Sequence, residues 1–164
     1  MHPKTLTENI IYKNAFVTIY DNKVVLPSGK ETSHIKIESA SSKKNSKSHG
    51  VAVLPITKAG KILLIKEYYY GIDDYLYVVP RGFVDEKDIE KAAHRELREE
   101  TGYTTKSKNM RYVQRFIENP RVQDHCTHTF FAKDVEKTNA TKLDPTEVIE
   151  GSFEFNESEV IEMC

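Results

Sequence analysis

A chain of 164 residues fits a single domain, because compact domains usually span about 100–200 residues. Its 24 basic and 25 acidic residues nearly cancel, so the charge balance favours neither a nucleic acid nor a membrane as the main partner. Cys126 and Cys164 are too few and too far apart for a disulfide framework. The chain also shows no signal peptide and no apolar run near the ~20 residues that span a bilayer, which predicts a cytoplasmic, unanchored protein.

The N-terminal part is predicted to form an antiparallel β-meander. Short runs of β-branched and aromatic residues alternate there with turn residues. The expected strands are 16–20, 24–26 and 34–37, with turns at Asp21-Asn22 and Pro27-Ser28-Gly29. The polar stretch 41–48 has no hydrophobic periodicity and is most simply a connector. We therefore expect residues 1–40 to be an N-terminal part of the same unit, and residues 41–164 to be the main domain.

The main domain is predicted to contain a buried sheet. Residues 51–56 and 62–65 are almost continuously apolar, which indicates burial on both faces, and a turn at Lys58–Lys61 joins them. Further strands are expected at 76–79, 110–116, 128–132 and 151–155, with a short helix starting near residue 156. Strands on both sides of one strong helix predict an α+β (mixed α/β) fold with a mixed sheet.

The strong helix is predicted to run from Ile89 to Thr101. Asp88 suits the N-cap, and Gly102 is placed to close the helix in a left-handed turn. At about 100° per residue, three glutamates fall beside the apolar stripe, and the opposite side carries Lys91, His94 and Arg98. The glutamates are Glu96, Glu99 and Glu100, and the stripe consists of Ile89, Ala92, Ala93 and Leu97.

Glutamate-rich helices usually mark a solvated, salt-bridged surface. Here, however, like-charged carboxylates next to a packed face repel one another and are costly to desolvate unless protons or a cation compensate them. A hard divalent cation such as Mg²⁺ or Mn²⁺ accepts carboxylate, carbonyl, water and phosphate oxygens together. The helix is therefore suited to holding a metal against a pyrophosphate.

The segment from Gly82 to Tyr103 resembles the box of the Nudix family, G-x5-E-x7-R-E-U-x-E-E-x-G-U, where U is a bulky apolar residue. Its second half, Arg95-Glu-Leu-Arg-Glu-Glu-Thr-Gly-Tyr103, matches every fixed position. The first half is one residue short, with twelve residues between Gly82 and Arg95 where the family has thirteen. The early Glu position is therefore open among Glu86, Lys87 and Asp88, and Arg95 is expected to pair with Asp88 or Glu86.

The resemblance implies a Nudix-type α/β/α sandwich with a central mixed sheet. It also implies that Glu96, Glu99 and Glu100 bind Mg²⁺ or Mn²⁺ or organise its waters, with a backbone carbonyl near Arg81 or Gly82 as a further ligand. Arg95 is expected to orient these groups. Many members draw another catalytic glutamate from a loop near the domain end, and Glu147 is the candidate here, although an exposed loop glutamate often has no such role.

Residues outside the box are similar to the ADP-ribose and ADP-compound pyrophosphatase branch. Pro120 matches a loop proline that faces the substrate there, although a lone proline is equally often an ordinary turn. The branch often has Arg where this chain has Tyr68-Tyr69-Tyr70, and Glu where it has Val78. Tyr69 is a candidate for stacking on adenine, although tyrosines at a strand end more often pack. Together with Arg81, Gly82 and Pro120 it is expected to bind substrate.

The resemblance thus predicts metal-dependent hydrolysis of ADP-ribose or a related ADP compound, by attack of water on phosphorus, to AMP and a phosphorylated product. Two alternatives stay open: the same fold acting on dinucleoside polyphosphates or NADH, and a catalytically silent nucleotide sensor. The branch also implies a homodimer that uses the N-terminal strands. The expected partner is a small nucleoside diphosphate derivative, with no nucleic acid and no membrane.

Overall fold

A computed structural model describes the chain except for residues 40–48, 85–87, 124, 139–140 and 164. It forms two compact units, one of residues 1–49 and 116–127 and the other of residues 50–115 and 128–164. The expected connector, residues 41–48, lies outside the described residues, and the boundary at residue 40 stays a prediction. Neither helix in the described part of the chain has the length and apolar character that a membrane crossing requires.

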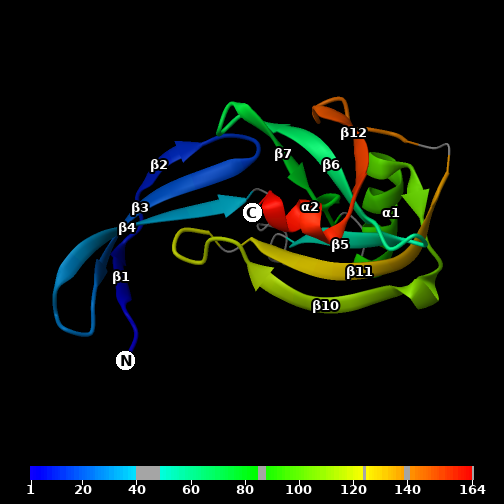
Figure 1. Cartoon of the computed structure of the whole chain (residues 1–164). Coiled ribbons are helices and arrows are strands. Elements are labelled where there is room, and N and C mark those ends of the chain that lie inside the picture. The colour runs from blue at the N-terminus through cyan, green and yellow to red at the C-terminus, as the bar shows by residue number, and fades with distance from the viewer. Residues whose placement is uncertain (40–48, 85–87, 124, 139–140, 164) are drawn as a thin grey trace. The chain divides into compact units, whose positions relative to one another are not determined.

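The first unit contains an antiparallel four-stranded sheet (Figure 1). β1 and β2 pair with different halves of β3, and β4 pairs along its whole length. The predicted turn at Asp21-Asn22 is wrong, because Asn22 is buried within β3 and faces His34 of β4. The turn after Leu26 is present, with the N–H of Gly29 donating to the Leu26 carbonyl. The strands are β1 (Lys4–Thr7), β2 (Ile10–Lys13), β3 (Val17–Val25) and β4 (Glu31–Ser39).

The larger sheet has eight strands and carries the strands that sequence predicts in the middle of the chain. Its order is β10-β11-β5-β6-β12, and β7 pairs with β6, β8 with β5 and β9 with β11. Residues 51–53 and 63–65 are buried consecutively, as expected for strands covered on both faces. The strands are β5 (His49–Thr57), β6 (Ile62–Tyr69), β7 (Asp74–Val78), β8 (Arg81–Phe83), β9 (Tyr103–Thr104), β10 (Met110–Ile117), β11 (Cys126–Lys137) and β12 (Ile149–Phe155).

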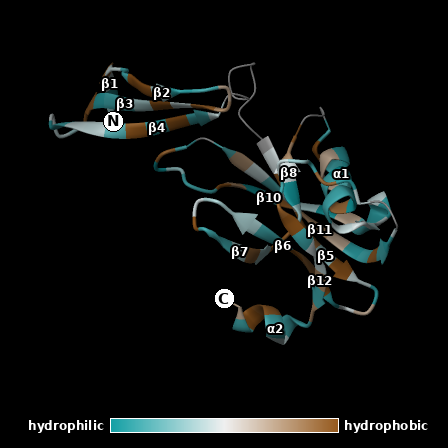
Figure 2. Cartoon of the chain, turned by 90° about the horizontal axis from the view of Figure 1, so that it is seen from above, coloured by the Kyte–Doolittle hydropathy of each residue, from teal (hydrophilic) through white to brown (hydrophobic). Residues whose placement is uncertain are grey.

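Two α-helices accompany this sheet in the described part of the chain, α1 (Ile89–Thr101) and α2 (Glu157–Glu162). The apolar stripe of α1 packs on side chains of β5, β6 and β11, and apolar segments on these strands are visible in Figure 2. The core consists of Val51, Val53, Leu63, Ala92, Ala93, Leu97, Tyr103, Met110, Phe130, Ala132 and Val135. A mixed sheet with few helices confirms the predicted α+β class, and this core fixes α1 in place.

Candidate active site

Helix α1 begins and ends where the sequence predicts. The side chain of Asp88 accepts from the N–H groups of Glu90 and Lys91, which satisfies two free donors of the first turn. At the other end Gly102 adopts φ 71°, and its N–H donates to the carbonyl of Arg98. These caps and the packed stripe determine which side chains face the sheet.

Two of the three box glutamates are buried on that face. Glu96 is 5% exposed and Glu100 is 4% exposed, whereas Glu99 lies at the edge and is partly exposed. The prediction that Lys91, His94 and Arg98 lie on the outer side of the helix is only partly correct, because His94 is half-buried. Two carboxylates are therefore held in an environment where ionisation is costly.

Glu96 lies directly against the backbone of Gly82. A Cβ atom placed on Gly82 would stand 2.2 Å from Oε1 of Glu96 and 2.3 Å from its Cδ. Gly82 belongs to β8, a short strand that pairs with residues 50–52 of β5 and that is not among the strands expected from the sequence. A glycine in this strand lets the carboxylate approach the main chain closely.

Glu100 is tied to the residue before that glycine. The N–H of Arg81 donates to Oε2 of Glu100 over 2.8 Å. Burial raises the pKa of Glu100 to about 9, against the effect of this hydrogen bond, and the nearby carboxylates of Glu96, Glu147 and Glu67 raise it further. One backbone donor thus only partly compensates the charge of Glu100.

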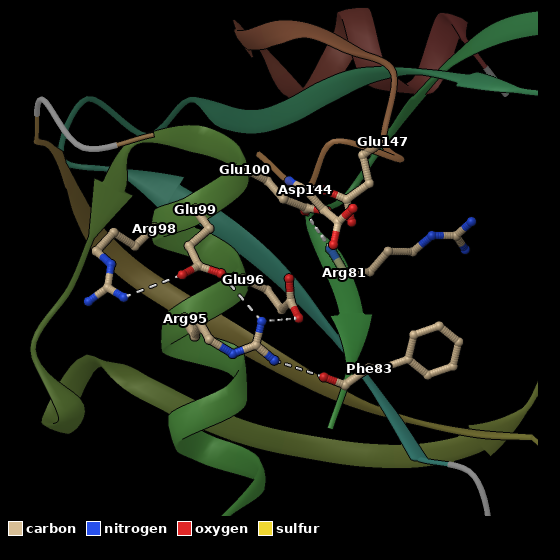
Figure 3. A network of polar contacts seen from close by, with 9 residues as sticks. All are labelled: Arg81, Phe83, Arg95, Glu96, Arg98, Glu99, Glu100, Asp144 and Glu147. Atoms are coloured by element: carbon tan, nitrogen blue, oxygen red, sulfur yellow. Dashed lines mark hydrogen bonds and ion pairs between the residues drawn. The ribbon is translucent and has the colours of Figure 1, made fainter. Parts of the chain in front are cut away.

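Arg95 joins the helix glutamates to β8 (Figure 3). Its guanidinium lies 2.8 Å from Oε1 of Glu96 and 3.4 Å from Oε2 of Glu99, and it donates to the carbonyl of Phe83. Burial raises the pKa of Glu96 to about 7, although the charge of Arg95 opposes the rise. The expected pairing of Arg95 with Asp88 is wrong, because the carboxylate of Asp88 caps the helix. Glu86 lies outside the described residues.

A loop of the same unit brings Glu147 to this cluster. The N–H of Lys142 donates to the carbonyl of Glu99, and the N–H of Glu147 closes a turn on the carbonyl of Asp144. Figure 3 shows the side chains of Asp144 and Glu147 next to Glu100. Burial raises the pKa of Glu147. The negative charge of Glu147 in turn raises the pKa values of Glu96 and Glu100. The structure therefore brings together all the acidic residues predicted for the site.

The two candidate substrate residues Tyr69 and Arg81 contact each other. Nη2 of Arg81 donates to the Tyr69 hydroxyl over 2.8 Å, and the guanidinium lies over the tyrosine ring, 5.2 Å from its centre. The Tyr69 hydroxyl also donates to Glu67. Sequence reasoning missed Glu67, and its one signal was its position two residues before Tyr69, on the same side of a strand.

Pro120 belongs to the first unit, in a turn where the N–H groups of Val122 and Gln123 both point to the carbonyl of Asn119. This is the ordinary turn that a lone proline often marks. A role of Pro120 toward the substrate stays a prediction.

The donor set fits a hard divalent cation. The groups that meet between α1 and β8 are carboxylates and backbone carbonyls. Arg95 compensates Glu96 and Glu99, whereas Glu100 receives only the N–H of Arg81 from the residues that the structure describes. Among the described residues, no three His, Cys, Asp or Glu side chains already converge as a complete ligand set. Water and phosphate oxygens would have to complete it, as is usual for Mg²⁺.

A model of the NUDIX domain matches residues 47–162, which is well over half of the chain and includes α1 and β8. The chain belongs to the NUDIX family. The prediction of a Nudix pyrophosphohydrolase is thus confirmed.

The curated proteins similar to this chain include an ADP-ribose pyrophosphatase. The ADP-ribose pyrophosphatase of Bacillus subtilis (strain 168) is 29% identical over 165 residues, covering 99% of this Nudix chain and 77% of that protein. The methanol dehydrogenase activator of Bacillus methanolicus is 29% identical over 151 residues, covering 90% of this chain and 75% of that protein. A crystal structure of an ADP compounds hydrolase superposes with a TM-score of 0.80 at 17% identity, covering 99% of this chain and 82% of the other, which supports the fold.

Proposed function

We propose that this Nudix protein hydrolyses the diphosphate linkage of ADP-ribose or a related ADP compound, giving AMP and a phosphorylated product. The observation that carries the proposal is the pair of buried carboxylates, Glu96 and Glu100, that face β8 beside Glu147. A binding module has no need to bury several acidic groups next to one another, because their mutual repulsion costs stability. The similarity to an ADP-ribose pyrophosphatase supports the choice of substrate.

Glu96, Glu99 and Glu100 would hold Mg²⁺ or Mn²⁺, with the backbone carbonyl of Arg81 as a further ligand. When bound, the metal would neutralise the diphosphate and favour ionisation of a nearby water. Arg95 orients Glu96 and Glu99 through its guanidinium and anchors them to the carbonyl of Phe83. Gly82 leaves the space that the carboxylate of Glu96 occupies.

Glu147 is suited to receive a proton. In the proposed reaction the oxygen of water bonds to one phosphorus, the bridging P–O bond breaks, and the bridging oxygen leaves with the other phosphate. The carboxylate of Glu147 would accept the proton of the attacking water, and its raised pKa brings its basicity closer to neutral pH. The turn from Asp144 holds it beside Glu100.

Arg81 would contact the phosphates through its guanidinium, next to Tyr69 and Gly82. Pro120 is proposed to face the substrate from its turn, as the branch suggests. We also propose a homodimer that uses the N-terminal strands, which expose Ile10, Ile11 and Tyr12.

A substrate panel tests this function. The protein would be incubated with Mg²⁺ and ADP-ribose, ADP-sugars, NADH, diadenosine polyphosphates or nucleoside triphosphates, and release of AMP or phosphate would be measured. We expect the highest kcat/KM for ADP-ribose or another ADP compound. Faster turnover of NADH or a dinucleoside polyphosphate would support that alternative, and no turnover of any compound would support a sensor.

A further inference from the structure

The hydroxyl of Tyr69 lies between a carboxylate and a guanidinium that come from different strands. Because the hydroxyl has one proton, it donates to the carboxylate of Glu67 and accepts from Nη2 of Arg81. Glu67 and Tyr69 lie on β6, whereas Arg81 lies on β8, so the tyrosine links two strands. This link fixes one N–H of a guanidinium that has five.

The charge of Arg81 stands apart from the carboxylates of the site. Its side chain leaves β8 in the direction away from α1 (Figure 3), and its guanidinium covers one face of the Tyr69 ring. Among the described residues, no carboxylate lies within 4.0 Å of this guanidinium, although the main chain of the same residue binds Glu100. Arg81 therefore contacts the acidic cluster through its main-chain N–H, while its side chain places a positive charge away from that cluster.

A separated cation of this kind matches an extended anion. A metal held by the helix glutamates would meet one phosphate, and a guanidinium with free N–H groups can bind oxygens of a neighbouring phosphate in a bidentate manner. Adenine stacking on Tyr69 is not favoured on the ring face that the guanidinium covers. The arrangement favours recognition of a second phosphate over recognition of a base.

We propose that Glu67 and Tyr69 are positioning residues that hold the Arg81 guanidinium for the second phosphate group of the substrate, so that compounds with two linked phosphates are preferred over monophosphates. Glu67 acts through Tyr69, and Tyr69 acts through Arg81. This inference rests on the proposed function for its ligand, but it concerns binding and not the chemical step.

Binding of a non-hydrolysable diphosphate tests this inference separately from the chemical step. Isothermal titration calorimetry with Mg²⁺ would compare α,β-methylene-ADP with AMP on the full chain and on Tyr69→Phe, Arg81→Ala and the double variant. We expect Tyr69→Phe to weaken binding of α,β-methylene-ADP by about tenfold, the size of one hydrogen bond to a charged group, with a smaller effect on AMP. The double variant should bind no more weakly than Arg81→Ala alone, because Tyr69 acts through Arg81.

Whether substitution of Glu67 weakens or strengthens binding of α,β-methylene-ADP is equally informative. Glu67→Met removes both the acceptor and a negative charge; a carboxylate that merely repels anions would then give tighter binding, whereas a positioning role gives weaker binding. Glu67→Gln keeps an acceptor and should restore affinity toward the wild-type value. Tyr70→Phe is the matched control, since Tyr70 is 91% exposed and next to Tyr69.

Three results would overturn the proposal: unchanged affinity in Tyr69→Phe, additive losses in the double variant, or no binding of α,β-methylene-ADP by the wild type. Circular dichroism of each variant confirms that it is folded. A wild type that binds the analogue but hydrolyses nothing would contradict the proposed function and leave this inference standing.

Discussion

The carboxylate of Glu96 occupies the space where any residue other than glycine at position 82 would place its Cβ atom. Gly82 has no left-handed φ, so the requirement comes from this contact and not from the backbone conformation. A strand residue and a helix residue fourteen positions apart are thus fitted to each other. The fit explains in physical terms why position 82 requires a glycine.

Gly82→Ala tests this contact. The added methyl group should push the Glu96 carboxylate away from β8 by about 1 Å or more, and misplacement on that scale can lower kcat about 100-fold. Steady-state kinetics on the best substrate would measure the change. Gly71→Ala is the control, because a Cβ there meets no atom within 4 Å. Wild-type kcat in Gly82→Ala would show that Glu96 need not stay where it is.

Glu100→Gln should separate activity from stability. The amide keeps an acceptor for the Arg81 N–H but cannot ionise to bind a metal, so we expect kcat to fall by about 100-fold or more while Tm in EDTA stays equal or rises. Kinetics and thermal unfolding would measure the two effects. Glu90→Gln at the other end of α1 should leave kcat nearly unchanged. A wild-type rate in Glu100→Gln would contradict the metal assignment.

Glu147→Gln should affect the chemical step more than binding. Loss of a proton acceptor typically costs about 100-fold or more in rate, so we expect kcat to fall strongly while KM changes little. The neighbouring Glu150→Gln, which loses its ion pair with Lys66, serves as the control. If the rate of Glu147→Gln equals that of the control, Glu147 is an ordinary loop residue.

The stability of the metal-free protein should depend on pH. The folded-state pKa values of about 7 for Glu96 and about 9 for Glu100 lie above the ~4.3 of an unfolded chain. Between these limits the folded state holds more protons, so the free energy of unfolding falls as pH rises. Thermal unfolding in EDTA should therefore give a lower Tm at about pH 8 than at about pH 5.5.

Added Mg²⁺ should raise Tm more at the higher pH, because a metal binds the ionised carboxylates. Glu100→Gln should lose part of the pH dependence in EDTA. If Tm in EDTA depends on pH identically in the wild type and in Glu100→Gln, Glu100 is already ionised in the metal-free protein.

Local signals predicted the bounds and the buried face of α1. Asp88, Gly102 and the spacing of Ala92, Ala93 and Leu97 act within the helix or at its ends, so the sequence alone determines its bounds and buried face. The burial of Glu96 and Glu100 follows from the same spacing. The one-residue-shorter loop did not prevent this half of the box from forming as predicted.

Long-range pairing explains what the sequence did not predict. Asp21 and Asn22 favour a turn locally, but pairing with Ile35 and His34 keeps β3 extended. Residues 81–83 form a strand because they pair with residues 50–52 of β5. The contact of Tyr69 with Arg81 depends on β6 and β8 approaching each other, and no motif in either strand marks it.

Metal-dependent cleavage of ADP-ribose tests the proposed function most directly. The wild type and Glu100→Gln would be incubated with ADP-ribose, with Mg²⁺ or with EDTA, and AMP would be measured by chromatography. We expect AMP release by the wild type with Mg²⁺, almost none in EDTA, and a loss of about 100-fold or more in Glu100→Gln. Equal rates with and without metal, or in wild type and variant, would contradict it.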